Sequence, residues 1–248
     1  MAPTGCRQLR ATSRAAAIAR GPSERRHVSD WATVRTVACC NPRGCDQFFG
    51  ARFARHSANR YRKRGLDRTG RRIVGFLQSR GLEHATVLEV GGGVGELQLE
   101  LIKRGAARTI NLELSAAYEE EAARLARDAG IDGRVERRLH DIAVDPAQVE
   151  PADIVVLHRV VCCYPDYERL LGAAANHARR LLVFSHPPRN PISRAILAGQ
   201  NLGFRLWRKE FRVFAHPPAA MLTVLERHGL RPVFTHRGIP WQVAGLER

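Results

Sequence analysis

Residues 86–95 read Thr-Val-Leu-Glu-Val-Gly-Gly-Gly-Val-Gly, an apolar run that breaks into glycines. The run predicts a buried strand over residues 86–90, a tight turn over residues 91–95, and a helix that opens at Glu96 and ends near Gly105. In a doubly wound α/β sheet, the turn after such a strand is where a nucleotide-like ligand binds. Glycine is needed there because the chain turns sharply and the ligand packs against bare backbone.

The spacing of these glycines distinguishes between two kinds of ligand. A dinucleotide fingerprint, G-x-G-x-x-G, requires glycines at positions 91, 93 and 96, but residue 96 is glutamate. The glycines instead fall at positions 91, 93 and 95, and Glu89 precedes them. This E-x-G-x-G-x-G pattern resembles the first motif of class I S-adenosylmethionine-dependent methyltransferases.

Acidic residues stand at the ends of the next two predicted strands. Residues 109–113 end in Glu113, 18 residues past Gly95, and a strand near residues 135–139 is followed by Asp141. In nucleotide-binding βαβ units, an acid at the end of the second strand accepts hydrogen bonds from ribose hydroxyls. The resemblance implies that Asp141 meets the adenine amino group. Solvated strand ends are the alternative interpretation of both acids.

The rest of the chain follows the order of one α/β domain. Strand and helix patterns alternate over residues 84–185, which is typical of a parallel sheet with helices on both faces. A helix is predicted over residues 191–214, and two final strands predict a hairpin like the antiparallel end of the methyltransferase sheet. We therefore predict a Rossmann-like seven-stranded α/β methyltransferase domain over residues 81–248, with an N-terminal helical cap over residues 31–80 and a disordered basic leader over residues 1–30.

The basic residues are unevenly distributed along the chain. The formal net charge is +16, and residues 1–80 hold 18 Arg or Lys and 4 acids, whereas residues 81–248 hold 22 and 20. A basic segment can attract nucleic acid, an acidic membrane surface or an anionic small substrate, or it can be a solvated face. Because no RNA-binding signature, zinc-finger spacing or aromatic platform accompanies the charge, nucleic-acid binding is a secondary hypothesis.

Targeting and membrane signals are weak. No apolar run approaches about 20 residues, so no membrane span is predicted, and the first 30 residues lack the apolar core of a secretory signal. Their arginine-rich, acid-poor composition resembles a mitochondrial transit peptide. However, the whole chain holds 37 Arg against 3 Lys, so the bias need not reflect targeting. We expect a cytoplasmic protein, and the sequence leaves its oligomeric state open.

The segment after the fourth predicted strand indicates the acceptor side of the site. Residues 153–165 read Asp-Ile-Val-Val-Leu-His-Arg-Val-Val-Cys-Cys-Tyr-Pro. This segment is similar to small-molecule O-methyltransferases such as the ubiquinone-pathway and magnesium-protoporphyrin enzymes. Arg159 stands where those enzymes often have an acid, and Cys163 where they often have a histidine. The lack of an N-P-P-Y-type motif argues against a DNA-base or protein-glutamine methyltransferase.

The resemblance implies a cofactor, S-adenosylmethionine, and a set of site residues. The expected cofactor residues are Glu89, Gly91, Gly93, Gly95, Glu113, Asp141, Ile142 and His158. The expected acceptor residues are Phe49, Tyr61, Arg159 and Tyr164, and the catalytic candidates are His158, Arg159, Cys163 and Tyr164. A carboxylate, thiolate or phenolate acceptor needs only positioning, whereas an alcohol or amine needs a base, for which His158, His186 and His216 are candidates.

Five of the six cysteines fall into two groups: Cys39, Cys40 and Cys45, and the pair Cys162 and Cys163. Without a secretory signal we expect thiols rather than disulfides. The spacing does not match a zinc site, so no metal is predicted. Arsenite methyltransferases are a family precedent for cysteines near the methyl donor, and small buried apolar residues are the alternative.

These observations predict a methyltransferase that acts on a small organic acceptor, with an anionic acceptor as one option. The alternative is an RNA-associated methyltransferase, or a nucleic-acid-binding protein, that docks through its basic N-terminal third. A degenerate fold that binds the cofactor without turnover is a third hypothesis, because fold alone does not fix function.

Overall fold

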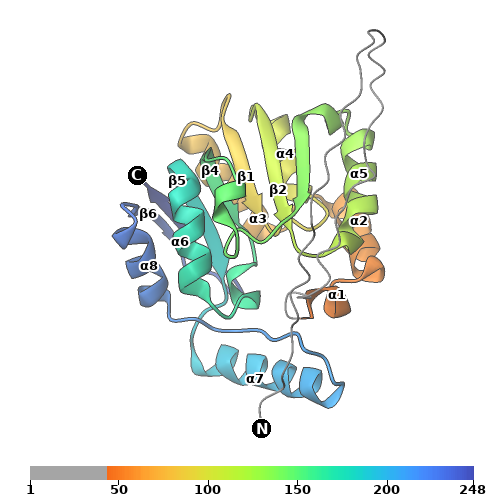
Figure 1. Cartoon of the computed structure of the whole chain (residues 1–248), viewed down its shortest axis with the longest axis vertical. Helices are drawn as coiled ribbons and strands as arrows, with labels where there is room; N and C mark the ends of the chain where they lie inside the picture. The colour runs from red at the N-terminus through yellow and green to blue at the C-terminus, as the bar shows by residue number, and fades with distance from the viewer. Residues whose placement is uncertain (1–43) are drawn as a thin grey trace, which may run out of the picture. The chain divides into compact units, whose positions relative to one another are not determined.

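The computed structural model describes residues 44–248, and a seven-stranded sheet lies at its centre (Figure 1). The strands are β1 (Thr86–Val90), β2 (Arg108–Glu113), β3 (Val135–Leu139), β4 (Ala152–Leu157), β5 (Ala178–His186), β6 (Arg231–His236) and β7 (Gln242–Glu247). Their order across the sheet is β3-β2-β1-β4-β5-β7-β6. β7 is antiparallel to both of its neighbours, and the remaining pairs are parallel. The predicted Rossmann-like, mostly parallel sheet with an antiparallel last strand is confirmed.

Helices cover both faces of this sheet. They are α1 (Cys45–Phe48), α2 (Ala51–Arg64), α3 (Arg68–Ser79), α4 (Glu96–Lys103), α5 (Glu119–Asp128), α6 (Tyr167–His177), α7 (Pro191–Leu206) and α8 (Pro218–Arg227), with the short turns η1 (Ala116–Tyr118), η2 (Asp132–Arg134), η3 (Pro146–Gln148) and η4 (Val161–Cys163). α6 and α8 pack on one face, and α3 and α4 pack on the other. α2 packs outside α4 and α5, with Ala54 and Ala58 buried against them.

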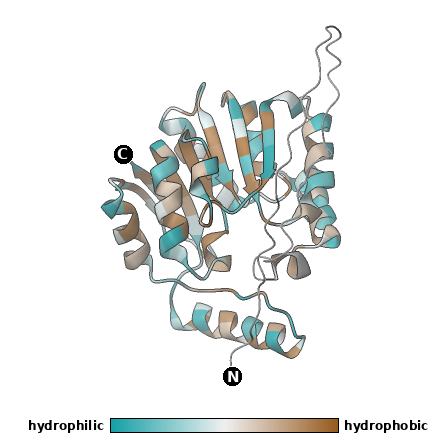
Figure 2. Ribbon diagram, in the orientation of Figure 1, coloured by the Kyte–Doolittle hydropathy of each residue, from teal (hydrophilic) through white to brown (hydrophobic). Residues whose placement is uncertain are grey.

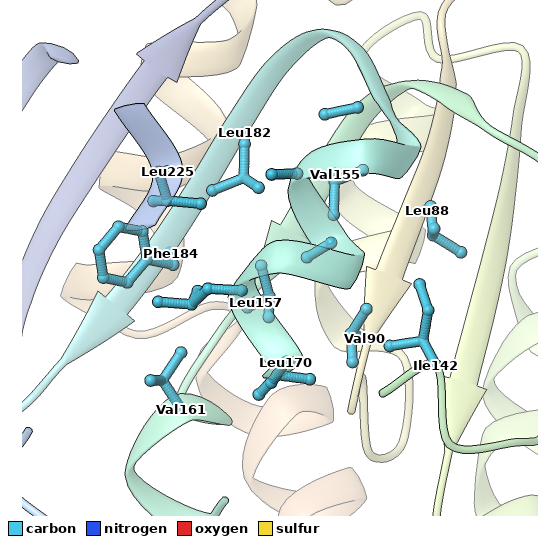
Figure 3. Close-up of a cluster of buried hydrophobic side chains, with 14 of the residues drawn as sticks. Leu88, Val90, Ile142, Val155, Leu157, Val161, Leu170, Leu182, Phe184 and Leu225 are labelled. Carbon is cyan, nitrogen blue, oxygen red and sulfur yellow. The ribbon is translucent and has the colours of Figure 1, made fainter. Parts of the chain in front are cut away.

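The central strands are apolar on both sides because both of their faces are covered. Leu88, Val155 and Leu182 come from β1, β4 and β5 and point to the face of α6 and α8 (Figure 3). The next residues along these strands, such as Ile154 and Val156, face α3 and α4 instead. Figure 2 shows the same strands as the brown centre of the sheet. This double-sided core fixes the strand ends from which the site is built.

The sheet order reverses between β1 and β4, where ligands bind in folds of this kind. The helical cap expected before the sheet corresponds in its described part to α1, α2 and α3. The leader expected over residues 1–30 and the start of the cap lie outside the described residues, so the division into leader, cap and domain remains a prediction. Over residues 44–248, no helix is both long and apolar enough to cross a membrane.

One predicted helix is shorter than expected. The structure ends α7 at Leu206, whereas the sequence pattern extended the helix to residue 214. Trp207 follows as the C-cap, and Arg208 then adopts a left-handed conformation with φ of 53°. That conformation cannot continue an α-helix. The following segment is extended, and it returns the chain past Cys162, whose carbonyl accepts a hydrogen bond from Phe214 N.

Candidate active site

The glycine turn after β1 has the backbone that its sequence demands. Gly91, Gly93 and Gly95 have φ angles of 69°, 55° and 83°, a region that costs other residues strain. A Cβ on Gly91 would also lie 2.5 Å from a methyl carbon of Val160. Gly95 has a different place from the other two, because it is the N-cap of α4. The turn therefore presents backbone without side chains at Gly91 and Gly93, which line the cavity described next.

The glycine turn opens into a cavity of about 370 Å³, a size that suits a small-molecule ligand. From the strand ends and the glycine turn, the lining includes Glu89, Gly91, Gly92, Gly93, Glu113, Asp141, Ile142 and His158. From the cap and the segment after β4, it includes Cys45, Phe49, Phe53, His56, Arg60, Arg159, Cys163 and Tyr164. The expected cofactor residues thus line one cavity, except for Gly95. Of the expected acceptor residues, only Tyr61 is outside it.

Glu113 ties the glycine turn to the end of β2. One carboxylate oxygen accepts a hydrogen bond from Gly93 N at 2.9 Å, and the other accepts from Leu114 N at 2.8 Å and Ser115 N at 3.2 Å. Burial raises the pKa of Glu113, and these three backbone donors oppose the shift by stabilising the ionised form. The carboxylate is therefore both an anchor for the turn and a wall of the cavity.

Below the turn, Glu89 and Asn111 fill the space that a side chain at Gly92 would need. A Cβ on Gly92 would lie 2.5 Å from Glu89 Oε2 and 2.6 Å from Asn111 Oδ1. Glu89 is buried, and desolvation raises its pKa to about 8. Its Oε2 has no hydrogen-bond partner within residues 44–248. A buried polar atom without a partner is costly, and here it lies in a residue of the cavity wall, where a ligand can satisfy it.

Arg137 supports the turn from β3, although the sequence did not single it out. Its guanidinium donates to the carbonyl oxygen of Gly93 at 2.8 Å and to the Glu119 carboxylate at 2.9 Å. The ion pair with Glu119 fixes the guanidinium, which therefore holds the carbonyl of Gly93 while Glu113 holds the N–H of the same residue. The sequence feature that could have identified Arg137 is a basic residue in the predicted strand 135–139, which follows the strands that carry Glu89 and Glu113.

Asp141 and Tyr164 form a pair at the end of β3. The Tyr164 hydroxyl donates to Asp141 Oδ2 at 3.0 Å, and Asp141 Oδ1 accepts from Ala143 N at 3.0 Å. Tyr164 is 5% exposed, so its ring is packed while its edge lines the cavity. In this arrangement Tyr164 holds the orientation of the Asp141 carboxylate.

His158 follows β4 and is paired with Ser185 on β5. Its Nδ1 lies 3.0 Å from Ser185 Oγ, and the same oxygen accepts from Arg159 N at 2.9 Å. Ser185 is fully buried, and its hydroxyl has no other acceptor within residues 44–248. The hydroxyl therefore donates to His158 Nδ1, which leaves the ring proton on Nε2. Burial lowers the pKa of His158 to about 4, so the ring is neutral and carries its N–H at Nε2.

Arg159 connects the segment after β4 to the cap. Its guanidinium forms an ion pair with Asp67, which also caps α3 by accepting from Gly70 N. The same guanidinium lies 5.0 Å from the centroid of the Trp241 ring, and φ at Arg159 is 62°. Arg159 therefore lines the cavity while an acid and an aromatic ring hold its guanidinium.

Tyr61 lies elsewhere than expected. Its hydroxyl donates to Glu100 Oε1 at 2.6 Å, between α2 and α4 and outside the cavity. The cavity side of α2 is instead formed by Phe53, His56 and Arg60, none of which was among the expected site residues. Adjacent helix residues point about 100° apart, so a shift of one position moves a side chain to another face. The spacing of three or four residues among these three was the signal that could have identified them.

The two described cysteine groups meet at this cavity, since both Cys45 and Cys163 line it. Cys162 Sγ lies 3.6 Å from Cys163 Sγ, and these two cysteines are free thiols. The hydrogen bond with Cys162 and burial raise the pKa of the Cys163 thiol. Cys39 and Cys40 lie outside the described residues. Within residues 44–248, no group of three His, Cys, Asp or Glu side chains could hold a metal ion.

Comparison with known proteins agrees with the sheet order and the glycine turn. Residues 57–239 match the family model of a methyltransferase domain, and the chain belongs to this family. S-Adenosylmethionine is the cofactor of the class I methyltransferases that share this sheet. No curated protein sequence matches the chain.

Solved structures of methyltransferases share the fold. Magnesium protoporphyrin IX methyltransferase from Synechocystis PCC 6803, with bound S-adenosylhomocysteine, superposes with a TM-score of 0.64 at 18% identity, over 82% of this chain and 99% of that one. The same enzyme with bound S-adenosylmethionine gives a TM-score of 0.61 at 18% identity, over 86% and 99%. An O-methyltransferase family protein from Burkholderia thailandensis gives 0.64 at 17% identity, over 83% of this chain and 63% of that one.

Proposed function

We propose that this protein transfers a methyl group from S-adenosylmethionine to a small organic acceptor. The observation that carries the proposal is the cavity at the point where the sheet order reverses. One wall of it is the glycine turn with Glu89 and Glu113, and the other is formed by the cap and the segment after β4. When bound, S-adenosylmethionine supplies an electrophilic methyl group on a sulfonium. The chain itself has to bind both substrates, orient the acceptor atom toward the methyl group, and exclude water from the site.

On the cofactor side, the residues fit the group. Glu113 has lone pairs for ribose hydroxyls beyond its three backbone contacts. Asp141 is held by Tyr164 in a position to accept from the adenine amino group, and Ile142 is an apolar neighbour for the base. The unpartnered Oε2 of Glu89 suits a cationic or N–H-bearing group of the ligand.

On the acceptor side, aromatic and cationic residues share one wall. Phe49 and Phe53 supply apolar surface, and Arg60 and Arg159 supply positive charge. Each arginine already faces one acid: Arg60 lies 3.6 Å from Glu96, and Arg159 pairs with Asp67. This composition supports an acceptor with an apolar body and an anionic group. The anionic group would contact an arginine that remains paired with its acid, either Glu96 or Asp67.

The protonation states of the wall favour an acceptor that needs no base. His158 carries its proton on Nε2, and the raised pKa of Cys163 keeps that thiol protonated. His140 Nε2 is bonded to the Asp145 carbonyl. Among the three histidines of the lining, only the exposed His56 has a ring without a hydrogen bond to the described residues. A carboxylate, phenolate or thiolate acceptor therefore fits this site better than an alcohol or amine.

The test is transfer of a labelled methyl group from S-adenosylmethionine to fractionated extracts, with Glu113→Ala as the matched protein control. We expect label in the small-molecule fraction with the wild-type chain and a large reduction with the variant. Label confined to the RNA fraction would instead support the RNA-associated alternative. Tight cofactor binding without transfer to any fraction would support a fold that binds without turnover.

A further inference from the structure

α7 presents an apolar face that the rest of the described chain does not cover. No residue of α7 is buried. Its exposed large apolar residues, with that of its C-cap, are Ile192 (72%), Ile196 (56%), Leu202 (57%), Leu206 (73%) and Trp207 (75%). Ile192, Ile196 and Leu206 lie on one face of the helix together with Gly199 and Gly203, because these positions recur at intervals of three or four residues. Leu202 and Trp207 lie at the two edges of this face.

The other side of α7 holds it to the protein in a fixed orientation. The Asn201 amide donates to the Val213 carbonyl at 2.8 Å and accepts from Val213 N at 2.9 Å. The Phe204 ring lies 5.3 Å from Phe48 and 5.5 Å from Phe211, between centroids. The Phe48 contact joins α7 to α1, and the other contacts join α7 to residues 211–213. Figure 1 shows α7 and α1 beyond the carboxyl ends of the strands. The apolar face is therefore not used for attachment.

The charge around α7 is strongly one-sided. Residues 189–212 contain six basic residues, Arg189, Arg194, Arg205, Arg208, Lys209 and Arg212, and one acid, Glu210. Within residues 44–248, no salt bridge pairs any of these six cations with an acid. Arg194 and Arg205 lie on the face of α7 opposite Ile192, and the other four cations lie before and after the helix. Apolar side chains on one face and arginines on the polar face are the composition of helices that lie in a membrane interface. Such cations also complement anionic headgroups.

We propose that α7 docks this protein on an anionic membrane surface. The face of Ile192, Ile196, Leu206 and Trp207 lies in the boundary between headgroups and acyl chains. The long arginine side chains of the polar face and of the helix ends extend to the lipid phosphates. Docking turns the α1 side of the molecule toward the membrane, because Phe204 of α7 packs on Phe48 of α1. Phe49, which borders that cluster, also lines the cavity. This inference is independent of which acceptor is methylated.

The first experiment is cosedimentation of the full chain with vesicles of phosphatidylcholine alone or of an equal mixture with phosphatidylglycerol. We expect binding to the anionic vesicles that weakens with salt. Ile192→Asp with Ile196→Asp should reduce that affinity about tenfold or more, since each isoleucine loses its burial. The matched control, Val144→Asp with Thr223→Asp, adds the same two charges at exposed positions outside α7 and should bind like the wild type. Equal binding by both double variants, or no binding by the wild type, would overturn the proposal.

The second experiment uses Trp207 as a probe, in a chain with Trp31→Phe and Trp241→Phe. We expect emission typical of exposed indole in buffer and a shift to shorter wavelength only with anionic vesicles. Emission already shifted in buffer would mean that another segment or a second copy covers α7, which contradicts membrane docking. Arg194→Gln and Arg205→Gln should each weaken vesicle binding about fivefold. Unchanged affinity in both would refute the role of lipid charge.

Discussion

The two walls of the cavity are built in different ways. The cofactor wall consists of residues at the ends of β1, β2 and β3. Glu113 and Asp141 accept hydrogen bonds from backbone N–H groups, and the buried Oε2 of Glu89 has no partner within residues 44–248. The acceptor wall comes from α1, α2 and the segment after β4, and its contacts are aromatic stacking and ion pairs such as Arg159 with Asp67. The first wall is therefore rigid and fixed by the sheet, whereas the second depends on how helices rotate and pack.

The largest expected effect is on the cofactor wall. Gly93→Val should weaken S-adenosylmethionine binding about a hundredfold or more, because the side chain adds overpacking and fills space at the ligand. The free protein should remain folded, since a Cβ at Gly93 meets only the Tyr118 ring at 3.5 Å. The positive φ should lower Tm by about 2–8 °C. Calorimetric titration and thermal melts measure the two effects.

Gly92→Val and Gly133→Ala provide the controls. Gly92→Val should lose the fold as well as binding, because its Cβ would clash with Glu89 and Asn111. A Cβ on Gly133 would meet nothing within 4 Å, so Gly133→Ala should change neither property. Normal binding by Gly93→Val would place the ligand away from the glycine turn. Stabilisation by NAD rather than S-adenosylmethionine would contradict the inference that Glu96, in place of a glycine, excludes a dinucleotide-binding turn.

The next effect concerns Glu113. Glu113→Ala should raise the Kd for S-adenosylmethionine by about tenfold to 150-fold, the equivalent of about 1.5–3 kcal/mol for hydrogen bonds to a charged acceptor. Glu113→Gln should cost less in stability and still weaken binding, because one acceptor oxygen becomes a donor. Cofactor titration measures both, and the acceptor KM at saturating cofactor should change little. Unchanged Kd in both variants would leave Glu113 with only its role in holding the turn.

The cofactor wall could be predicted from the sequence to a large extent, and the acceptor wall only in part. Glu89, Glu113 and Asp141 stand beside strand ends, and the carboxyl ends of parallel strands meet at one edge, so spacing alone placed them together. Gly95 is the exception, because it caps α4 rather than lining the cavity. The same apolar strand patterns predicted the mostly parallel seven-stranded sheet with its antiparallel last strand, which the structure confirms.

Site residues on helices were harder to predict, because a shift of one residue along a helix turns the side chain by about 100° to another face of the helix. Tyr61 was expected in the cavity and bonds to Glu100, while its neighbour Arg60 lines the cavity. No local pattern shows how α2 is rotated against α4 and α5, since that rotation is set by the packing of Ala54 and Ala58. The Ser185 contact that fixes the His158 tautomer joins β4 to β5 and is likewise a tertiary feature.

A smaller effect on the cofactor wall depends on pH. Burial raises the pKa of Glu89 to about 8 in the free protein, so its carboxyl is protonated at neutral pH. A cationic ligand group near Oε2 lowers that pKa, so binding releases a proton and the affinity rises with pH up to about 8, by at most about tenfold per pH unit. Titration of cofactor affinity from pH 6 to pH 9 in the wild type and in Glu89→Gln measures this. The affinity of the variant should not change with pH. If the wild-type affinity is also independent of pH, Glu89 does not contact a cationic group of the ligand.

The smallest effect concerns Arg159, on the acceptor wall. Arg159→Ala should raise the acceptor KM severalfold and leave cofactor affinity nearly unchanged, because the guanidinium lines the cavity on the side of the cap. Asp67→Asn is the matched control, since it removes the ion pair but keeps the guanidinium. If Arg159 binds an anionic acceptor, Asp67→Asn should leave KM unchanged or lower it, because the acceptor no longer competes with Asp67. If Arg159 only bridges the cap to the segment after β4, both variants should raise KM equally, and steady-state kinetics at saturating cofactor distinguish these outcomes.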